Sequence, residues 1–216
     1  MRFAHTIASG ITCISPLKEN SDNNIEFYET QSVEPYIGAR FFRKGIMAMA
    51  IAAVFIVIYV TIRFKKISGL SASVTALAAL LHDIILVFFT FVIFKIPIND
   101  GFVAVILTVL GYSINDTMVI YDKIRYNSRL HAGKMSYEEI ANLSINECIT
   151  RTINTSLMST IAIALVYVFS LVSGLTSVAN FALPMMVGII SGCYSTLTIT
   201  APLWVTWQNH KAKKVK

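Results

Sequence analysis

The length, composition and charge of this chain predict a membrane protein. It has 216 residues, of which 55% are hydrophobic and only 14% charged, whereas a soluble domain is about one quarter charged. Several apolar runs reach the ~20 residues that a helix needs to cross a bilayer. These features exclude a soluble enzyme, a secreted disulfide scaffold and a disordered region. The net charge of +6 comes largely from basic residues that flank the apolar runs, so we expect no nucleic-acid partner.

The first 44 residues differ in character from the rest. Met1–Ile14 makes a poor signal peptide, because it has one arginine and a short apolar run interrupted by polar residues. Residues 15–44, which precede the first apolar run, are soluble in character and contain five acidic residues (Glu19, Asp22, Glu26, Glu29 and Glu34). We expect residues 1–44 to form an extracytoplasmic segment.

No cofactor or metal site is expected. The three cysteines are scattered and lie outside any C-x-x-C pattern, so we predict free thiols (Cys13, Cys148 and Cys193).

Five apolar stretches predict five transmembrane helices. They cover approximately residues 45–62, 69–94, 101–121, 152–172 and 180–205. The alternating pattern of a membrane β-barrel is absent, so the fold class we expect is an all-α polytopic membrane protein. The segments at 63–68 and 95–100 are tight connections, while 122–151 is a longer loop.

The distribution of lysine and arginine predicts the orientation. Basic residues concentrate in the loop after the first span, in the 122–151 loop and in the tail at 206–216. By the positive-inside rule, the tail and the 122–151 loop face the cytoplasm. The odd number of spans, together with the basic cluster Arg40, Arg43 and Lys44 on the opposite side, suggests that an upstream span is missing.

The 122–151 loop has a structural signal of its own. Ser136 and Glu139 form the pattern of a capping box, which predicts a short helix through about Cys148. This helix is either a solvated cytoplasmic element or a docking surface for a partner.

Three charged residues lie within or at the edge of the apolar spans. Asp83, next to His82, is near the middle of the second span, and Asp116 is in the third. Arg151 opens the fourth span and precedes a hydroxyl-rich stretch. Charges inside a bilayer are costly, so two acids and an arginine suggest a titratable path between helices. The alternatives are a snorkelling Arg151, a structural acceptor at Asp116 and a helix–helix contact at Asp83.

An ion pair between Asp116 and Arg151 would be less costly than either charge alone, because both lie at similar depth. In the fifth span, Gly188 and Gly192 form a GxxxG pattern that predicts close helix packing. Pro184 and Pro202 could kink this span, and Trp204 and Trp207 look like interfacial anchors.

Four ordered motifs resemble those of the SecF family of protein-export membrane proteins. They are G-Y-S-I-N-D-T-M-V-I-Y-D-K-I-R-Y-N at 111–127, A-L-L-H-D at 79–83, S-I-N-E-C-I-T-R-T at 144–152 and Y-S-T-L-T-I-T-A-P-L at 194–203. The resemblance covers about residues 26–205. It implies a helical bundle of the resistance-nodulation-division (RND) type, because the SecD/SecF group belongs to the RND superfamily.

The resemblance also implies a function. SecF acts with SecD, the SecYEG translocon and YajC in the inner membrane, and uses the proton-motive force to help move unfolded preproteins; it is not an enzyme. By motif position, Asp116, Arg151 and Asp83 match the residues of a proton relay. Polar neighbours would support them (His82, Asn115, Thr117, Asn154 and Ser156).

The family normally has six spans, with a periplasmic domain between the first two. Residues 26–45 resemble the last strand of that domain, so we expect a short remnant of it before the bundle. The chain is then a fragment, a truncated product or a reduced SecF. The other functions considered are an RND-like exporter of small molecules or lipids, a purely structural partner of SecD, and an intramembrane aspartyl protease, whose G-x-G-D context Asp116 lacks.

Overall fold

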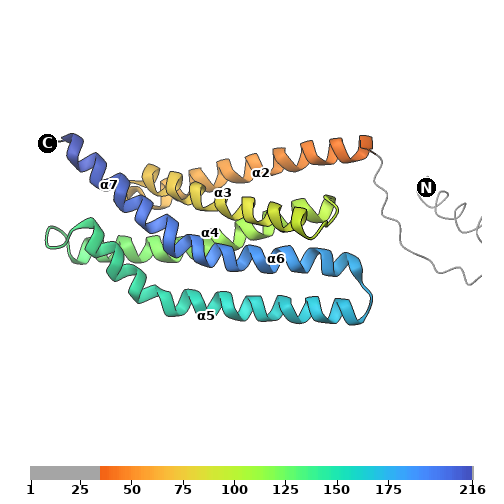
Figure 1. Cartoon of the computed structure of the whole chain (residues 1–216). Coiled ribbons are helices and arrows are strands. Elements are labelled where there is room, and N and C mark those ends of the chain that lie inside the picture. The colour runs from red at the N-terminus through yellow and green to blue at the C-terminus, as the bar shows by residue number, and fades with distance from the viewer. Residues whose placement is uncertain (1–34, 216) are drawn as a thin grey trace, which may run out of the picture. The chain divides into compact units, whose positions relative to one another are not determined.

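The computed structural model describes the backbone of residues 35–215 and the side chains of residues 43–213. The strand remnant expected near residue 26, most of the acidic segment and Cys13 lie outside these residues. Within the described part, every regular element is helical (Figure 1). The elements are α2 Pro35–Arg63, η1 Lys65–Ile67, α3 Gly69–Ile93, α4 Asp100–Leu130, α5 Tyr137–Val172, α6 Thr176–Ser195, the π-helical segment η2 Thr196–Thr200 and α7 Ala201–Val215.

Among the described residues, five helical stretches are long and apolar enough to cross a membrane, in agreement with the all-α polytopic fold expected from the sequence. They are Arg43–Arg63, Gly69–Ile93, Asp100–Leu130, Tyr137–Val172 and Thr176–Lys213. The helices pack so that α6 contacts α3, α4 and α5, while α2 lies against α3 and α4. In Figure 1, α2 and α5 accordingly lie on opposite sides of the bundle.

The bundle interior has three layers along its length. One apolar cluster, around Phe64, Tyr121 and Trp204, lies near the end where α2 turns into α3. A second cluster, around Phe91 and Phe102, lies near the other end. Between the two clusters, the helices carry buried polar side chains (Asp83, Ser113, Asp116, Thr117, Ser191, Ser195 and Thr196).

The 122–151 region is more helical than the sequence suggested. The predicted capping box is present, because Ser136 Oγ accepts from the Glu139 backbone N–H and the Glu139 side chain accepts from the Ser136 N–H. The helix that it opens, however, does not end near Cys148 but continues to Val172. The sequence from 137 to 172 contains no glycine or proline, so no residue interrupts the helix at the membrane boundary.

The last span bends at a π-helical segment. Pro184 lies inside α6 without ending it. Pro202 has no N–H to donate to the preceding turn, and the five residues before Ala201 form the wider π turns of η2. Beyond this segment α7 leans away from the direction of α6 (Figure 1).

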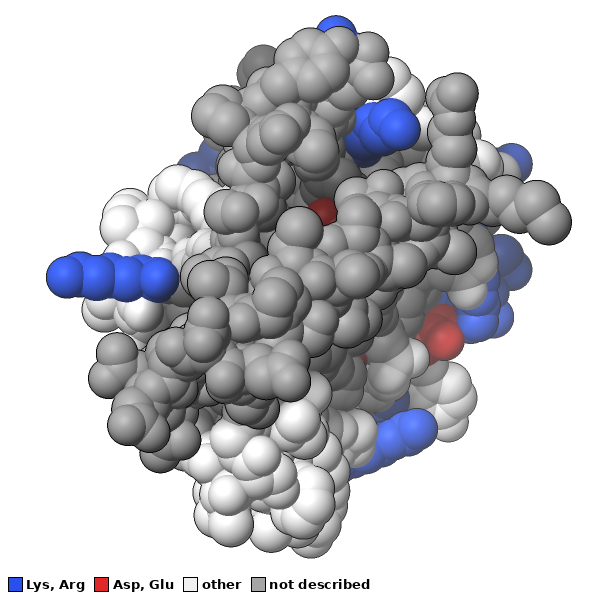
Figure 2. Space-filling model, turned by 90° about the vertical axis from the view of Figure 1, so that its right-hand side faces the viewer, with Lys and Arg blue, Asp and Glu red and all other residues white. Residues whose placement is uncertain are grey.

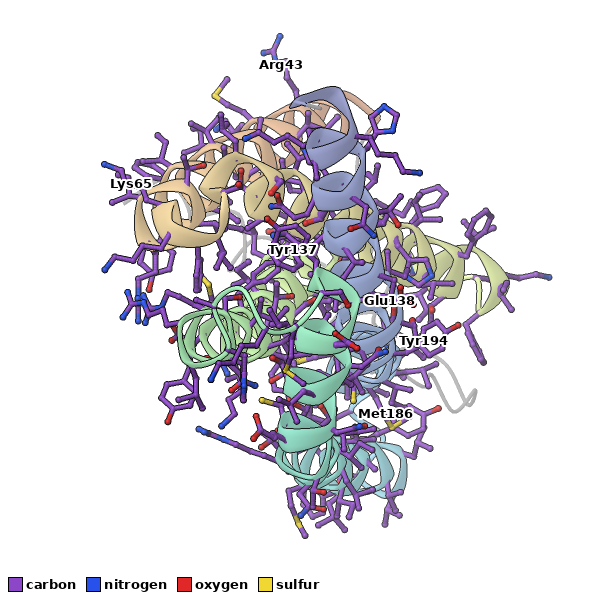
Figure 3. All side chains as sticks on the ribbon, turned by 90° about the vertical axis from the view of Figure 1, so that its left-hand side faces the viewer. Arg43, Lys65, Tyr137, Glu138, Met186 and Tyr194 are labelled. Atoms are coloured by element: carbon purple, nitrogen blue, oxygen red, sulfur yellow. The ribbon has the colours of Figure 1, made fainter. Side chains whose placement is uncertain are left out.

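Trp204 is not the interfacial anchor that its position suggested. Its ring is 1% exposed, and its Nε1 donates to the carbonyl oxygen of Ile67 at 3.2 Å. Gln208 Nε2 donates to the same carbonyl at 3.2 Å, so α7 is attached to the turn between α2 and α3. Tyr137 lies at the start of α5 (Figure 3), and its ring meets that of Trp204 edge-on, with 6.0 Å between the ring centroids. Trp207, by contrast, is 47% exposed.

Candidate functional site

Asp83 of α3 is a fully buried carboxylate that accepts hydrogen bonds from two other helices. Ser113 of α4 donates to Oδ2 at 2.7 Å. Ser191 of α6 donates to Oδ1 at 2.6 Å, and Ser195 of the same helix donates to Oδ2 at 2.9 Å. His82 Nδ1 lies 3.3 Å from Oδ1. These contacts satisfy both oxygens of Asp83 inside the bundle.

Close packing of α6 makes this arrangement possible. A Cβ added at Gly192 would lie 3.1 Å from Cβ of Ser113. At Gly188 it would collide with Val109 of α4 and lie 2.9 Å from Val87 of α3. The two glycines therefore lie where α6 approaches α3 and α4 most tightly, and they bring the serines of α6 within reach of Asp83.

Asp116 of α4 is also buried but has far fewer partners. Its carboxylate accepts one hydrogen bond, from Ser156 Oγ of α5 at 3.3 Å. Ser156 and Ser159 in turn accept from the hydroxyl of Tyr112 at 3.4 and 3.3 Å. The links between α4 and α5 at this level are thus longer than those around Asp83.

Thr117 connects the two carboxylates along α4 and the π segment. It follows Asp116 in sequence and pairs with Thr196 Oγ1 at 3.2 Å. Thr196 itself follows Ser195, which donates to Asp83. A polar row therefore runs from Asp83 through η2 to the turn of α4 that carries Asp116.

Arg151 does not meet Asp116. Its side chain is exposed, and among residues 43–213 it forms no ion pair. It lines a cleft of about 500 Å³ between α4 and α5, together with residues of both helices (Val119, Asp122, Lys123, Tyr126, Glu147 and Cys148). The acids of this cleft are already paired with other basic residues: Arg63 and Arg125 bind Asp122, and Lys123 binds Glu147 at 3.3 Å.

The supporting polar residues fall into two groups. His82, Thr117 and Ser156 contact a carboxylate or continue the polar row. Asn115 and Asn154 are exposed on the outer surface of α4 and α5. The serines of Asp83 were missed from the sequence, although Ser191 and Ser195 share one helical face with Gly188 and Gly192.

The outer faces of the helices differ in side-chain size. α2 exposes large apolar side chains, including Phe55, which is 67% exposed. α4 instead exposes a row of small or polar residues at helical spacing (Ala104, Thr108, Gly111 and Asn115). A Cβ added at Gly111 would meet nothing within 4 Å, so this row is open in the isolated chain.

Comparisons with known proteins agree with this architecture. Residues 13–210 match the family described as protein export membrane protein SecD/SecF, C-terminal. The chain is 36% identical over 199 residues to the protein translocase subunit SecDF of Bacillus subtilis, covering 91% of this chain and 25% of that one. It is 37% identical over 200 residues to SecF of Rickettsia bellii, covering 93% of this chain and 63% of that one.

A solved structure matches as well. The crystal structure of SecDF from Thermus thermophilus, a translocon-associated membrane protein, superposes with a TM-score of 0.73 at 33% identity. The match covers 82% of this chain and 23% of that one. The chain thus spans about a quarter of the SecDF relatives and less than two thirds of the SecF relatives. With its bundle and its sequence both matching, the chain belongs to the SecD/SecF family of protein-export membrane proteins.

Proposed function

We propose that this chain is a SecF-like subunit that acts with a SecD-like partner and uses the proton-motive force to help move preproteins across the inner membrane. The observation that carries the proposal is that Asp116 is buried in a membrane-spanning helix with a single hydrogen-bond partner. This acid is 3% exposed, lies in a membrane-spanning helix and accepts a single hydrogen bond of 3.3 Å. A buried acid with so little stabilisation of its charged form is suited to take up and release a proton.

The side chains on the outer face of α4 favour contact with another protein over contact with lipid. Lipid tails are apolar, so a lipid-facing helix favours large apolar side chains of the kind that α2 exposes. The row from Ala104 to Asn115 on α4 has small and polar side chains, which allow another helix to approach closely and to form hydrogen bonds. Relatives of this chain include SecDF proteins, so the partner that we propose for this face is SecD-like.

In this proposal, the protonation of Asp116 controls how strongly α4 attracts α5. Ionised Asp116 accepts from Ser156 and attracts the unpaired charge of Arg151, both on α5. When Asp116 binds a proton, this attraction weakens and the arrangement in which α5 and the partner helices have shifted becomes more populated. Proton entry on one side of the membrane and release on the other then give the cycle a direction.

The charge distribution supports the orientation. Lysine and arginine gather where α2 turns into α3, where α4 ends and along α7 (Lys65, Lys66, Lys123, Arg125, Arg129, Lys211 and Lys213). Figure 3 views this end of the bundle and shows Lys65 projecting away from the helices. Figure 2 views the molecule from the opposite end, where some Lys and Arg side chains are also visible. By the positive-inside rule this end faces the cytoplasm, and SecYEG, YajC and preproteins are the further partners that we propose.

The experiment compares Asp116→Asn with Asp122→Asn, which makes the same change further along α4, outside the buried layer. Each variant is produced with its SecD-like partner in inverted membrane vesicles, and preprotein movement is measured with and without a proton gradient. We expect Asp116→Asn to lose the part that depends on the gradient while the partner still co-purifies. Asp122→Asn keeps that part.

Export by Asp116→Asn at the wild-type rate, with the same response to the gradient, contradicts the proton role. That outcome, with normal co-purification, favours the alternative in which the chain is a structural partner of the SecD-like subunit.

A further inference from the structure

The helix α7 has two faces of different character. Its inner face carries Trp204 and Gln208, which attach it to the turn that contains Ile67. Its outer face is exposed and carries apolar residues followed by basic ones (Leu203, Trp207, His210, Lys211 and Lys213). We propose that this outer face binds the headgroups of anionic phospholipids at the membrane surface.

The contacts of Trp204 place α7 at the level of the membrane surface. Its Nε1 donates to the carbonyl oxygen of Ile67, in a turn that also carries Lys65 and Lys66. Basic residues of this kind flank the hydrocarbon region of a bilayer. Trp207 follows three residues later with an exposed ring. Tryptophan favours this level because its ring is apolar and its N–H is polar.

The lysines of α7 come next along the helix, at the depth of the headgroups. A helix rises ~1.5 Å per residue, which places Lys211 about 6 Å and Lys213 about 9 Å beyond Trp207 along α7. The headgroup region is roughly 5–8 Å thick on each side of a bilayer. Because α7 leans away from the direction of α6 (Figure 1), its lysines extend less far from the hydrocarbon than these distances along the helix. An apolar ring followed by ammonium groups thus matches the order of the layers in a leaflet.

No neighbouring acid competes with a lipid phosphate for these lysines. α7 contains neither aspartate nor glutamate. Among residues 43–213, neither Lys211 nor Lys213 forms an ion pair, whereas Lys123 binds Glu147. A hollow of about 490 Å³ also lies along this face, lined by Leu203, Thr206, Trp207, His210 and Lys211. Its volume is within the usual range of small-molecule sites. Charge and space therefore both favour an anionic headgroup.

The composition of α7 favours lipid over protein as the occupant of this face. Lysine is depleted in the cores of protein interfaces. Four lysines lie between positions 211 and 216, directly after the last span. A cluster of this size beside a membrane helix is typical of binding to anionic lipid. The orientation that we propose places it at the cytoplasmic leaflet, which has a negative surface potential.

Tryptophan fluorescence of the full chain in lipid nanodiscs tests this proposal. The chain has two tryptophans, so the wild-type spectrum minus that of Trp207→Phe reports on Trp207 alone. One set of nanodiscs contains phosphatidylcholine, and the other also contains phosphatidylglycerol. Lipids brominated on the acyl chain close to the glycerol serve as quenchers. Both leaflets have the same composition, so the result does not depend on the orientation of the chain.

We expect phosphatidylglycerol to shift the emission of Trp207 to shorter wavelength and to increase its quenching by the brominated lipid. About 0.5 M salt should reverse both changes, because it shortens the screening length to ~4 Å. The buried Trp204, measured in the same way with Trp204→Phe, should not respond to the lipid.

Two double variants test the role of the lysines. Lys211→Gln with Lys213→Gln should lose most of the response to phosphatidylglycerol. Lys44→Gln with Lys95→Gln removes the same charge at the opposite end of the bundle, and it should keep the full response. An equal loss in both double variants would overturn the proposal.

Two further outcomes would also overturn it. One is the same emission and quenching of Trp207 in both kinds of nanodisc. The other is emission at short wavelength without quenching by brominated lipid when the SecD-like partner is present, because a protein then covers this face. None of these measurements involves Asp116 or proton transport. Failure of lipid binding therefore leaves the proposed function standing, and failure of the Asp116 test leaves lipid binding standing.

Discussion

Asp83 and Asp116 are two carboxylates of almost equal burial with very different surroundings. Asp83 is 0% exposed and has three hydroxyl donors from two other helices. Asp116 is 3% exposed and has one, at the long distance of 3.3 Å. Burial by itself therefore does not identify a functional acid. The number of hydroxyl donors differs instead, and we expect it to decide how much each carboxylate contributes to the stability of the bundle.

The largest expected difference concerns removal of each carboxylate. Asp83→Ala leaves buried serine hydroxyls without an acceptor, at ~1–3 kcal/mol for each. We expect the free energy of unfolding to fall by about 3 kcal/mol or more. Asp116→Ala should change it by less than about 1 kcal/mol, because one long hydrogen bond is lost and an uncompensated buried charge is removed. Denaturant unfolding in mixed micelles measures both values, and equal losses would break the comparison.

The second prediction tests the packing that surrounds Asp83. Gly188→Ala places a methyl group against Val109 and Val87, and such overpacking costs ~1–3 kcal/mol of unfolding free energy. Gly111→Ala, on the open face of α4, is the matched control, and it should stabilise the isolated chain by up to about 1 kcal/mol through higher helix propensity.

A bulkier change at Gly111 tests whether the outer face of α4 binds the SecD-like partner. Gly111→Leu fills the small-residue row of α4, so it should reduce co-purification of the SecD-like partner, while the isolated chain remains at least as stable as the wild type. Retention of the partner at the wild-type level would show that this face of α4 is not the interface.

The smallest expected effects come from single donors. Ser191→Ala removes a 2.6 Å hydrogen bond to Asp83 and should cost about 1 kcal/mol of unfolding free energy. Ser156→Ala removes the 3.3 Å bond to Asp116 and should leave stability nearly unchanged. Parallel thermal unfolding of the two variants checks the order. A larger loss at Ser156 would contradict our distinction between the two carboxylates.

Local sequence features were enough to predict the helices. Five apolar stretches predicted five membrane-spanning helices, and Ser136 with Glu139 predicted the capping box; both predictions are confirmed. The extent of the helix that follows was wrong, because the polar residues before Arg151 suggested a boundary that the backbone does not have. A change in polarity marks a membrane surface, but it does not by itself end the hydrogen-bonded helix.

The sequence marked Trp204 as an interfacial residue because it lies near the end of the last span. The structure buries it, since η2 redirects α7 over the turn that contains Ile67. The position of a tryptophan along a span indicates its depth but not the direction in which its ring points. That direction depends on the path of the helix.

By itself, the sequence determined the class of fold, the positions of the spans and the presence of two acids within them. These properties follow from hydropathy and spacing along a continuous stretch of chain. Only the tertiary structure decided how the two acids differ. The donors to Asp83 are 30, 108 and 112 residues away in sequence, and close packing at Gly188 and Gly192 brings them together. No local pattern specifies such a cluster, because its members meet only when α3, α4 and α6 have packed.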